Sequence, residues 1–144
     1  MIEKRLQQEI NLVITEAKNH RLELITVEHL LIALLNISEV VSFLRGKLVN
    51  IDEIRAELER YIDSHTPVFP EDVEPDIVPS SGFFRVLADS VYLAHCAQRN
   101  SVNAMNVLVS IFSYKESHAV SMLKLNNISR IDIMEGISSQ LDDT

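Results

Sequence analysis

Histidine and cysteine side chains are the first candidates for chemistry in this sequence. The chain contains five histidines and a single cysteine, Cys96. A thiol activated by a histidine is the arrangement of a cysteine hydrolase. His95 directly precedes Cys96, but consecutive side chains on a helix diverge by about 100° and share a proton poorly. A small hydrolase using His95, His118 or Cys96 would therefore need these groups to converge from different elements in one pocket.

A metal site is the second chemical possibility. Two histidines and a carboxylate are adequate zinc ligands, and His20, Asp63 and His65 form such a set if the ends of two predicted helices meet. A histidine at the C-terminal end of its helix is also favoured by the helix dipole without any metal. We therefore expect structural histidines, no metal site and no cofactor.

Nucleotide chemistry is excluded by the glycines. There are three, Gly46, Gly82 and Gly136. A Walker A loop needs two glycines five positions apart followed by lysine, and a dinucleotide fingerprint needs three closely spaced glycines. Neither pattern fits these positions, so we expect no ATP binding by this chain.

Composition points to a soluble binding protein of one domain. The chain has 144 residues, of which 47% are hydrophobic, and its formal net charge is −8. An acidic chain with scattered basic residues repels a phosphate backbone, which argues against nucleic acid as a partner. No apolar run approaches the roughly 20 residues of a membrane span. With one cysteine and no signal-peptide pattern, the sequence predicts a cytoplasmic protein without membrane contact.

The spacing of apolar residues predicts helices that must position these side chains. An amphipathic helix is expected over 3–19, and Thr26 offers a hydroxyl as the N-cap of a second helix. Glu28 falls in the first turn of that helix, where a negative charge suits the dipole. Ser38 is a candidate cap for a third helix, and Asp52 opens a fourth. No segment reads as a convincing strand, so the predicted fold class is all-α.

The second half of the sequence repeats the first. TVEHLLIALL at 26–35 is matched by NAMNVLVSIF at 103–112, an offset of 103 − 26 = 77. Thr26 thereby corresponds to Asn103, a second cap. We predict a pseudo-twofold duplication of a four-helix unit, with about eight helices in one domain. Repeat one is expected at 1–64, the linker at 65–81 and repeat two at 82–144.

The predicted linker contains all four prolines of the chain, at 67, 70, 75 and 79. Prolines at this density forbid a continuous helix and favour an extended connection. The acidic run EDVEPD at 71–76 fits a solvated linker or an arm that becomes ordered on a partner. We expect residues 66–80 to be the first site of proteolysis.

Four stretches, taken in order, resemble one known family. They are TVEHLLIALL, TPVFP, FFRVLADSV and NVLVSIFSYKESHAVSMLK, at 26–35, 66–70, 83–91 and 106–124. Together they resemble the Clp N-domain family of AAA+ unfoldases, and within it the N-terminal domains of the ClpA type. The resemblance runs from about residue 6 to residue 138 and implies the duplicated fold.

The resemblance also implies a function. A ClpA-type N-domain is a noncatalytic module without the ATPase modules; it docks the adaptor ClpS and receives N-degron proteins as substrates. The parent hexamer passes them to the peptidase ClpP, whereas the isolated domain is expected to be monomeric. The family's docking surface carries over to Glu23, Glu28, Ser80 and Arg85, which we expect near the surface. Ser80 stands where the family pattern has threonine.

One departure and one alternative accompany the resemblance. Domains of this type can bind zinc through an H-x-H pair and a glutamate, but this chain has Leu22 as the second residue of that pair and Asp63 at the acidic position. Because leucine cannot ligate, the metal site is not carried over. The alternative function is that of a ClpC-like or ClpB-like N-domain, which binds unfolded or modified substrates directly.

Overall fold

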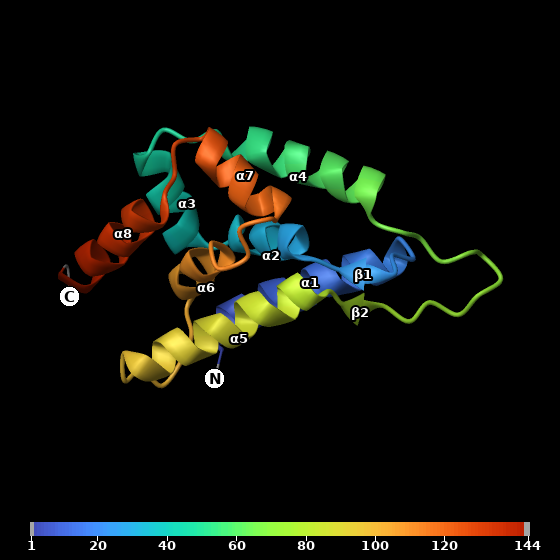
Figure 1. The fold of residues 1–144 in the computed structure, drawn as a ribbon, viewed down its shortest axis with the longest axis horizontal. Coiled ribbons are helices and arrows are strands. Elements are labelled where there is room, and N and C mark those ends of the chain that lie inside the picture. The colour runs from blue at the N-terminus through green and yellow to red at the C-terminus, as the bar shows by residue number, and fades with distance from the viewer. Residues whose placement is uncertain (1, 143–144) are drawn as a thin grey trace.

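The fold is built almost entirely from helices (Figure 1). The computed structural model describes residues 2–142. Within this range the elements are, in order, α1 (Lys4–Asn19), β1 (Leu24–Ile25), α2 (Val27–Leu34), α3 (Ser38–Gly46), α4 (Ile51–His65), β2 (Val78–Pro79), α5 (Ser81–Cys96), α6 (Ala104–Ile111), α7 (His118–Leu125) and α8 (Arg130–Asp142). The predicted all-α fold with about eight helices is confirmed.

The helices pack in a pattern that occurs twice. In the first half α1 and α4 pack on α2, and in the second half α5 and α8 pack on α6. The two central helices contact each other, and each also reaches across to the other half, α2 to α7 and α6 to α3. The halves therefore share one core instead of forming two separate ones.

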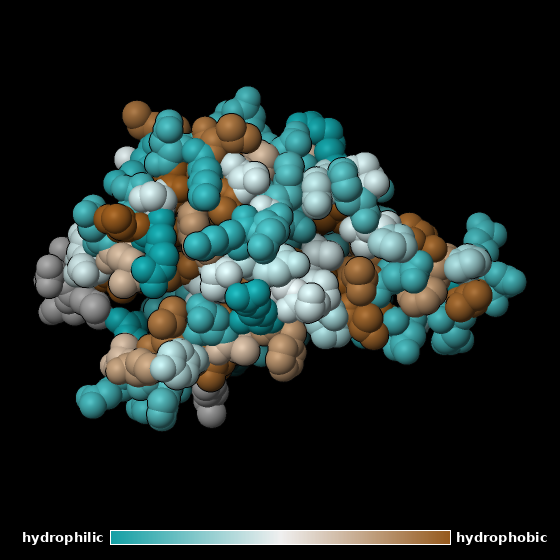
Figure 2. Space-filling view, in the orientation of Figure 1, coloured by the Kyte–Doolittle hydropathy of each residue, from teal (hydrophilic) through white to brown (hydrophobic). Residues whose placement is uncertain are grey.

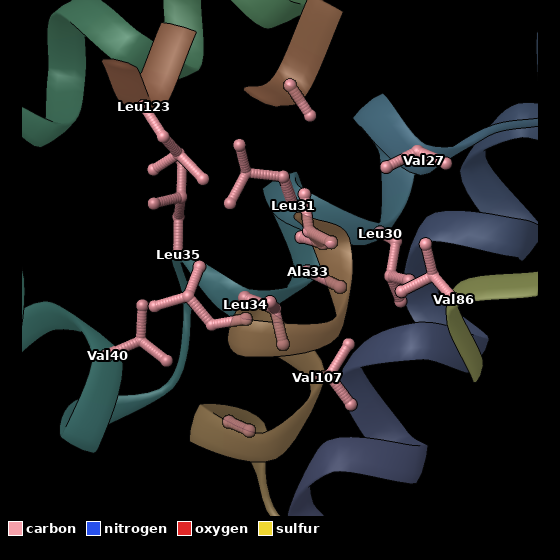
Figure 3. Packing of buried hydrophobic residues seen from close by; sticks show 14 of the residues in the cluster. Val27, Leu30, Leu31, Ala33, Leu34, Leu35, Val40, Val86, Val107 and Leu123 are labelled. Atoms are coloured by element: carbon pink, nitrogen blue, oxygen red, sulfur yellow. The ribbon is translucent and has the colours of Figure 1, made fainter. Parts of the chain in front are cut away.

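The central helices are buried because they are apolar on nearly every side. Both α2 and α6 have 8 residues, and only one residue of each is not buried. Figure 3 shows side chains of α2 packed among those of α3, α5, α6 and α7: Leu30, Leu31, Leu34, Val40, Val86, Val107 and Leu123. Among the described residues, no single helix is long and apolar enough to span a membrane. Only α2 and α3 taken together reach that length and apolarity, across a bend of 87°.

The duplication is also visible in the backbone angles at helix ends. Within residues 2–142, four non-glycine residues have positive φ: Arg21 (60°), Leu48 (62°), Gln98 (57°) and Asn127 (62°). Arg21 and Gln98 follow the first helix of each half, whereas Leu48 and Asn127 follow the third. Left-handed residues of this kind close helix C-termini. Each half therefore ends the same two helices in the same way.

Two of the predicted helix starts need correction. Helix α3 begins at Ser38 itself, after Ile37, and has no side-chain cap. Helix α4 begins at Ile51, one residue before Asp52, and is capped by Asn50, whose side-chain oxygen accepts a hydrogen bond from the Glu53 N–H at 3.2 Å. A cap residue has an extended backbone, and Ser38 is already helical here.

The predicted linker is held at both ends by the segment that follows α1. Near its start, the Glu23 N–H donates to the Pro67 carbonyl and the Phe69 N–H donates to the Arg21 carbonyl. Near its end, β2 pairs in parallel with β1, and the Ser80 N–H donates to the Ile25 carbonyl at 2.8 Å. The expectation of no strand was wrong at this point, because two-residue strands are too short to show an alternating pattern.

The middle of the linker projects from one end of the molecule (Figures 1 and 2). Residues 70–76 are exposed. The guanidinium of Arg21 donates hydrogen bonds to the carbonyls of Pro70 and Val73 at the base of this projection. The linker is therefore an ordered connection that residues 21–25 hold through the backbone at its two ends and that Arg21 holds at Pro70 and Val73.

Candidate partner-binding site

The strand pair brings two of the four predicted docking residues to one edge. Glu23 is half-buried, and its carbonyl accepts a hydrogen bond from the Val78 N–H at 3.2 Å. Ser80 follows β2 directly and is also half-buried. Its hydroxyl accepts a hydrogen bond from the Phe83 N–H at 3.1 Å and so caps α5. Ser80 thus has a structural role as an N-cap, which both serine and threonine can fill.

Arg85 lies just beyond the first turn of α5 and is exposed. Its guanidinium carbon lies 6.0 Å from the centre of the Tyr114 ring, a cation–π distance. Tyr114 in turn lies against the backbone of Gly82, where an added Cβ would meet the ring at 2.7 Å. Gly82 therefore admits the ring that supports Arg85. Neither Gly82 nor Tyr114 was among the predicted site residues.

Glu28 does not lie at the surface, contrary to our expectation. It is buried, with 7% of its surface exposed. Its Oε2 accepts a hydrogen bond from the Ala119 N–H at 3.1 Å. Ala119 lies in the first turn of α7, whose free N–H groups favour a negative charge. A carboxylate of the first half thus caps a helix of the second half.

His29 is a second buried polar residue, with 5% of its surface exposed. Its Nδ1 accepts a hydrogen bond from the Thr26 N–H at 3.0 Å, and the Thr26 hydroxyl oxygen accepts a hydrogen bond from the His29 N–H. The predicted cap at Thr26 is confirmed and is one side of this capping box. Burial lowers the pKa of His29 from 6.5 to about 4, so the ring is neutral near pH 7. In α6 the same box is formed by Asn103, which was also predicted as a cap, and Asn106.

The makeshift zinc set is not assembled. His20 and Asp63 line one pocket, but His65 does not. The ring of His65 is stacked on Tyr61 at 4.0 Å between centroids. Within the described part of the chain, no three histidine, cysteine, aspartate or glutamate side chains are grouped closely enough to hold a metal ion.

The candidate hydrolase groups are also separated. Cys96 and His95 are exposed at the end of α5. His118 begins α7, where its ring stacks on Tyr61 at 4.0 Å and its Nε2 lies 3.7 Å from Glu57 Oε1. His118 therefore belongs to an aromatic stack on α4 and not to a pocket shared with the thiol.

The sequence matches a known family over most of its length. Residues 1–126 match the family described as Clp repeat (R) N-terminal domain. A protein of Fuscovulum blasticum named "ClpA homolog protein" is 30% identical over 134 residues, which cover 92% of this chain and 17% of that protein. The chain therefore spans about a sixth of the length of this relative.

Solved structures share the fold at low sequence identity. The N-terminal domain of Hsp104 from Candida albicans has a TM-score of 0.76 at 15% identity and covers 94% of this chain and 87% of its own. The N-domain of ClpV from Vibrio cholerae has a TM-score of 0.76 at 13% identity, covering 99% and 86%. The N-terminal domain of ClpD from Arabidopsis thaliana has a TM-score of 0.65 at 17% identity, covering 97% and 96%.

Proposed function

The chain belongs to the Clp N-terminal domain family, and from this premise we propose that it docks the adaptor ClpS on a surface containing Glu23, Ser80 and Arg85. Domains of this family are noncatalytic parts of AAA+ Clp chaperones. The observation that supports the proposal most is the pairing of β1 with β2. This pairing joins the segment of Glu23 to the start of α5, which carries Ser80 and Arg85.

The chemistry of this surface suits a polar, mixed-charge contact. Glu23 offers a carboxylate and Arg85 a guanidinium, and both side chains reach solvent. The ring of Tyr114 restricts Arg85 before any partner binds, which lowers the entropy lost on docking. Charged groups at the rim of an interface set orientation and association rate more than affinity.

Glu28 takes an indirect part in this proposal. Its carboxylate is engaged by the Ala119 N–H inside the fold, so it is a positioning residue for α7 and not a contact residue. We infer that replacing Glu28 weakens docking only through the stability and shape of the domain.

The proposed place of the domain in a larger process follows from the ClpA-like relative. A docked adaptor would bring N-degron proteins to the unfoldase, and the parent hexamer would pass them to ClpP in the cytoplasm. The isolated domain would act as a monomer.

The decisive experiment is a titration of purified ClpS against the domain and its variants. Arg85→Glu reverses an exposed charge and Glu23→Lys a half-buried one, and we expect each to weaken binding by about tenfold, equivalent to about 1.4 kcal/mol. Glu135→Lys, on the exposed side of α8, is the matched control and should bind as the wild type does. Melting temperatures recorded for all four proteins separate loss of contact from loss of fold. Equal affinity across the set would show that the docking surface lies elsewhere.

Direct substrate binding is the second candidate function, and the outer face of α5 favours it. Phe84 is 68% exposed, Tyr92 65% and Val91 43%, and they lie on one side of the helix. Tan and brown side chains run along the surface where α5 lies (Figure 2). Large exposed apolar residues that gather on one face mark interaction sites.

Substituting the corresponding residues of the first half tests this second function with little change to the fold. At an offset of 77, Phe84 corresponds to Gln7 and Tyr92 to Thr15, both exposed on α1. The double variant Phe84→Gln, Tyr92→Thr should keep the fold and, if substrates bind directly, lose capture of a permanently unfolded protein such as reduced, carboxymethylated lactalbumin. Unchanged capture would remove the α5 face from consideration.

A further inference from the structure

A pocket lies between α1, α2 and α4, and none of Glu23, Ser80 and Arg85 lines it. Its volume is about 250 Å³, which is enough for a small organic group. The floor is formed by buried apolar side chains, among them Val13, Ala17 and Ile62, which are 7%, 3% and 6% exposed. An apolar body placed on this floor would leave water.

The mouth of the pocket, meaning its exposed lining residues, is acidic. Glu16 of α1 and Glu59 and Asp63 of α4 line it and are exposed, as is His20. Among residues 2–142, no lysine or arginine lines the pocket. The carboxylates do not converge on one point, because no three metal-ligand side chains in this range are grouped closely enough to hold an ion. Exposed carboxylates on two helices at one pocket favour a cationic group.

His29 adds an independent polar feature to the wall. The side chain lines the pocket and is 5% exposed. Because its Nδ1 accepts the Thr26 N–H, the neutral ring carries its proton on Nε2. Among the described residues, this Nε2–H has no hydrogen-bond partner. The Nε2–H is therefore the donor that this part of the wall can offer to an oxygen or an aromatic face of a ligand.

The second half of the chain matches only one of the three acids. At the offsets of the repeat, Glu16 corresponds to Leu93 (93 − 16 = 77), Glu59 to Ser139 (139 − 59 = 80) and Asp63 to Asp143 (143 − 63 = 80). Glu16 and Glu59 are therefore specific to the first half.

We propose that this pocket binds a primary ammonium group carried on an apolar body. The apolar part lies on the floor against Val13, Ala17 and Ile62, and the ammonium lies among Glu16, Glu59 and Asp63 at the mouth. Two sources share this chemistry: a small free amine, and the N-terminal residue of a polypeptide with an apolar side chain.

Methyl NMR on isoleucine-labelled protein tests the proposal. Phenethylamine is the probe, and 2-phenylethanol is its neutral counterpart of similar shape. We expect phenethylamine to shift the methyl signals of Ile32 and Ile62, which line the pocket, and not that of Ile131, which is 67% exposed on α8. The Kd should be on the order of 1 mM for so small a ligand, and the alcohol should bind at least about tenfold more weakly.

Neutral isosteres at the mouth provide the matched variants. Glu59→Gln with Asp63→Asn removes two exposed charges without changing shape and should weaken phenethylamine binding about fivefold or more. Glu135→Gln removes an exposed charge outside the pocket and should leave binding unchanged. Equal binding of amine and alcohol, wild-type binding by the double variant, or no shift at about 20 mM amine would each overturn the proposal.

A peptide pair distinguishes the two sources. Phe-Gly-Gly-amide has a free α-ammonium, and its N-acetylated form does not. Shifts of Ile32 and Ile62 with the free peptide alone would support a polypeptide N-terminus as the occupant. Shifts with phenethylamine but neither peptide would support a small amine. Equal shifts with both peptides would overturn the proposal, because the charge would then make no difference.

Discussion

The central helices α2 and α6 follow one plan but differ in their ionisable residues. Both have 8 residues, both begin with a capping box, and both are buried. Where α2 has Glu28 and His29, α6 has Met105 and Asn106. Met105 packs in apolar surroundings, 3.5 Å from where a Cβ on Gly136 would lie, whereas Glu28 caps α7. The apolar core is thus common to both halves, and the first half alone brings a carboxylate and an imidazole into it.

Because of this difference, a change of pH affects the stability of the two halves unequally. Met105 and Asn106 have no proton to gain or lose, so the α6 side of the core is insensitive to pH. The α2 side contains His29, whose ring is neutral near pH 7 because burial lowers its pKa to about 4. Exchanging residues between the two copies therefore tests whether the α2 side is sensitive to pH.

Glu28→Lys should have the largest effect on stability. It would place a cation beside the free N–H groups of the first turn of α7 and bury a charge without a partner. Breaking a buried charged contact in this way destabilises proteins by about 3–5 kcal/mol. Urea denaturation monitored by circular dichroism measures the change.

Two milder substitutions at Glu28 sharpen the comparison. Glu28→Gln keeps an acceptor oxygen for the Ala119 N–H and should lose about 1 kcal/mol, whereas Glu28→Met, the second-half residue, leaves that N–H unpaired and should lose about 1–3 kcal/mol. If the lysine variant unfolds at the same urea concentration as wild type, the cap contributes nothing to stability.

His29 should make stability fall in mild acid. Its pKa is about 4 in the folded protein and 6.5 in an exposed histidine, so the unfolded chain binds the proton first as pH decreases. Stability from this residue is present above pH 6.5 and is lost as pH falls toward 4, by up to about 3 kcal/mol.

The second-half residue provides the control for this pH effect. His29→Asn can reproduce the box of α6, in which the Asn106 side-chain oxygen accepts the Asn103 N–H at 3.0 Å, but it has no proton to gain. Unfolding free energies at pH 7, 6, 5 and 4 should fall less steeply for the variant than for wild type. Parallel curves would contradict the role of His29.

Leu48 and Asn127 give the smallest test. Both follow the third helix of their half with φ of 62°, and Leu48 is 93% exposed. Asparagine tolerates this left-handed conformation better than leucine does. Leu48→Asn should therefore stabilise the domain by about 0.5–1 kcal/mol, and Asn127→Leu should destabilise it by a similar amount, both measured by thermal unfolding. If the two substitutions changed the melting temperature in the same direction, the prediction would be wrong.

Much of the fold followed from the sequence because its signals are local. The caps at Thr26 and Asn103 and the apolar runs after them lie within single helices, where spacing alone indicates structure. The constant offset between the two repeats then predicted where the helices of the second half lie in the sequence. The ordering of the linker was missed because its partners lie at 21–25, far away in sequence, and two-residue strands carry no periodic pattern.

The candidate site was harder to predict for the same reason. Glu28 looked like a surface residue because the first turn of a helix is usually solvated, but its partner N–H lies 91 residues further along the chain. The support of Arg85 by Tyr114 also depends on contacts between separate elements. The partner of a charged side chain in another element is set by tertiary packing, which a single sequence does not report.

The anchored linker means that chain continuity between the halves is not needed to hold them together. Its two ends are bonded through the backbone to residues 21–25, and every residue of the tip at 70–76 is exposed. A protease that cuts the tip would leave a nicked protein whose two fragments remain joined through α2 and α6 and melt as one unit. The same reasoning marks the tip as a place for new chain ends in a circularly permuted domain.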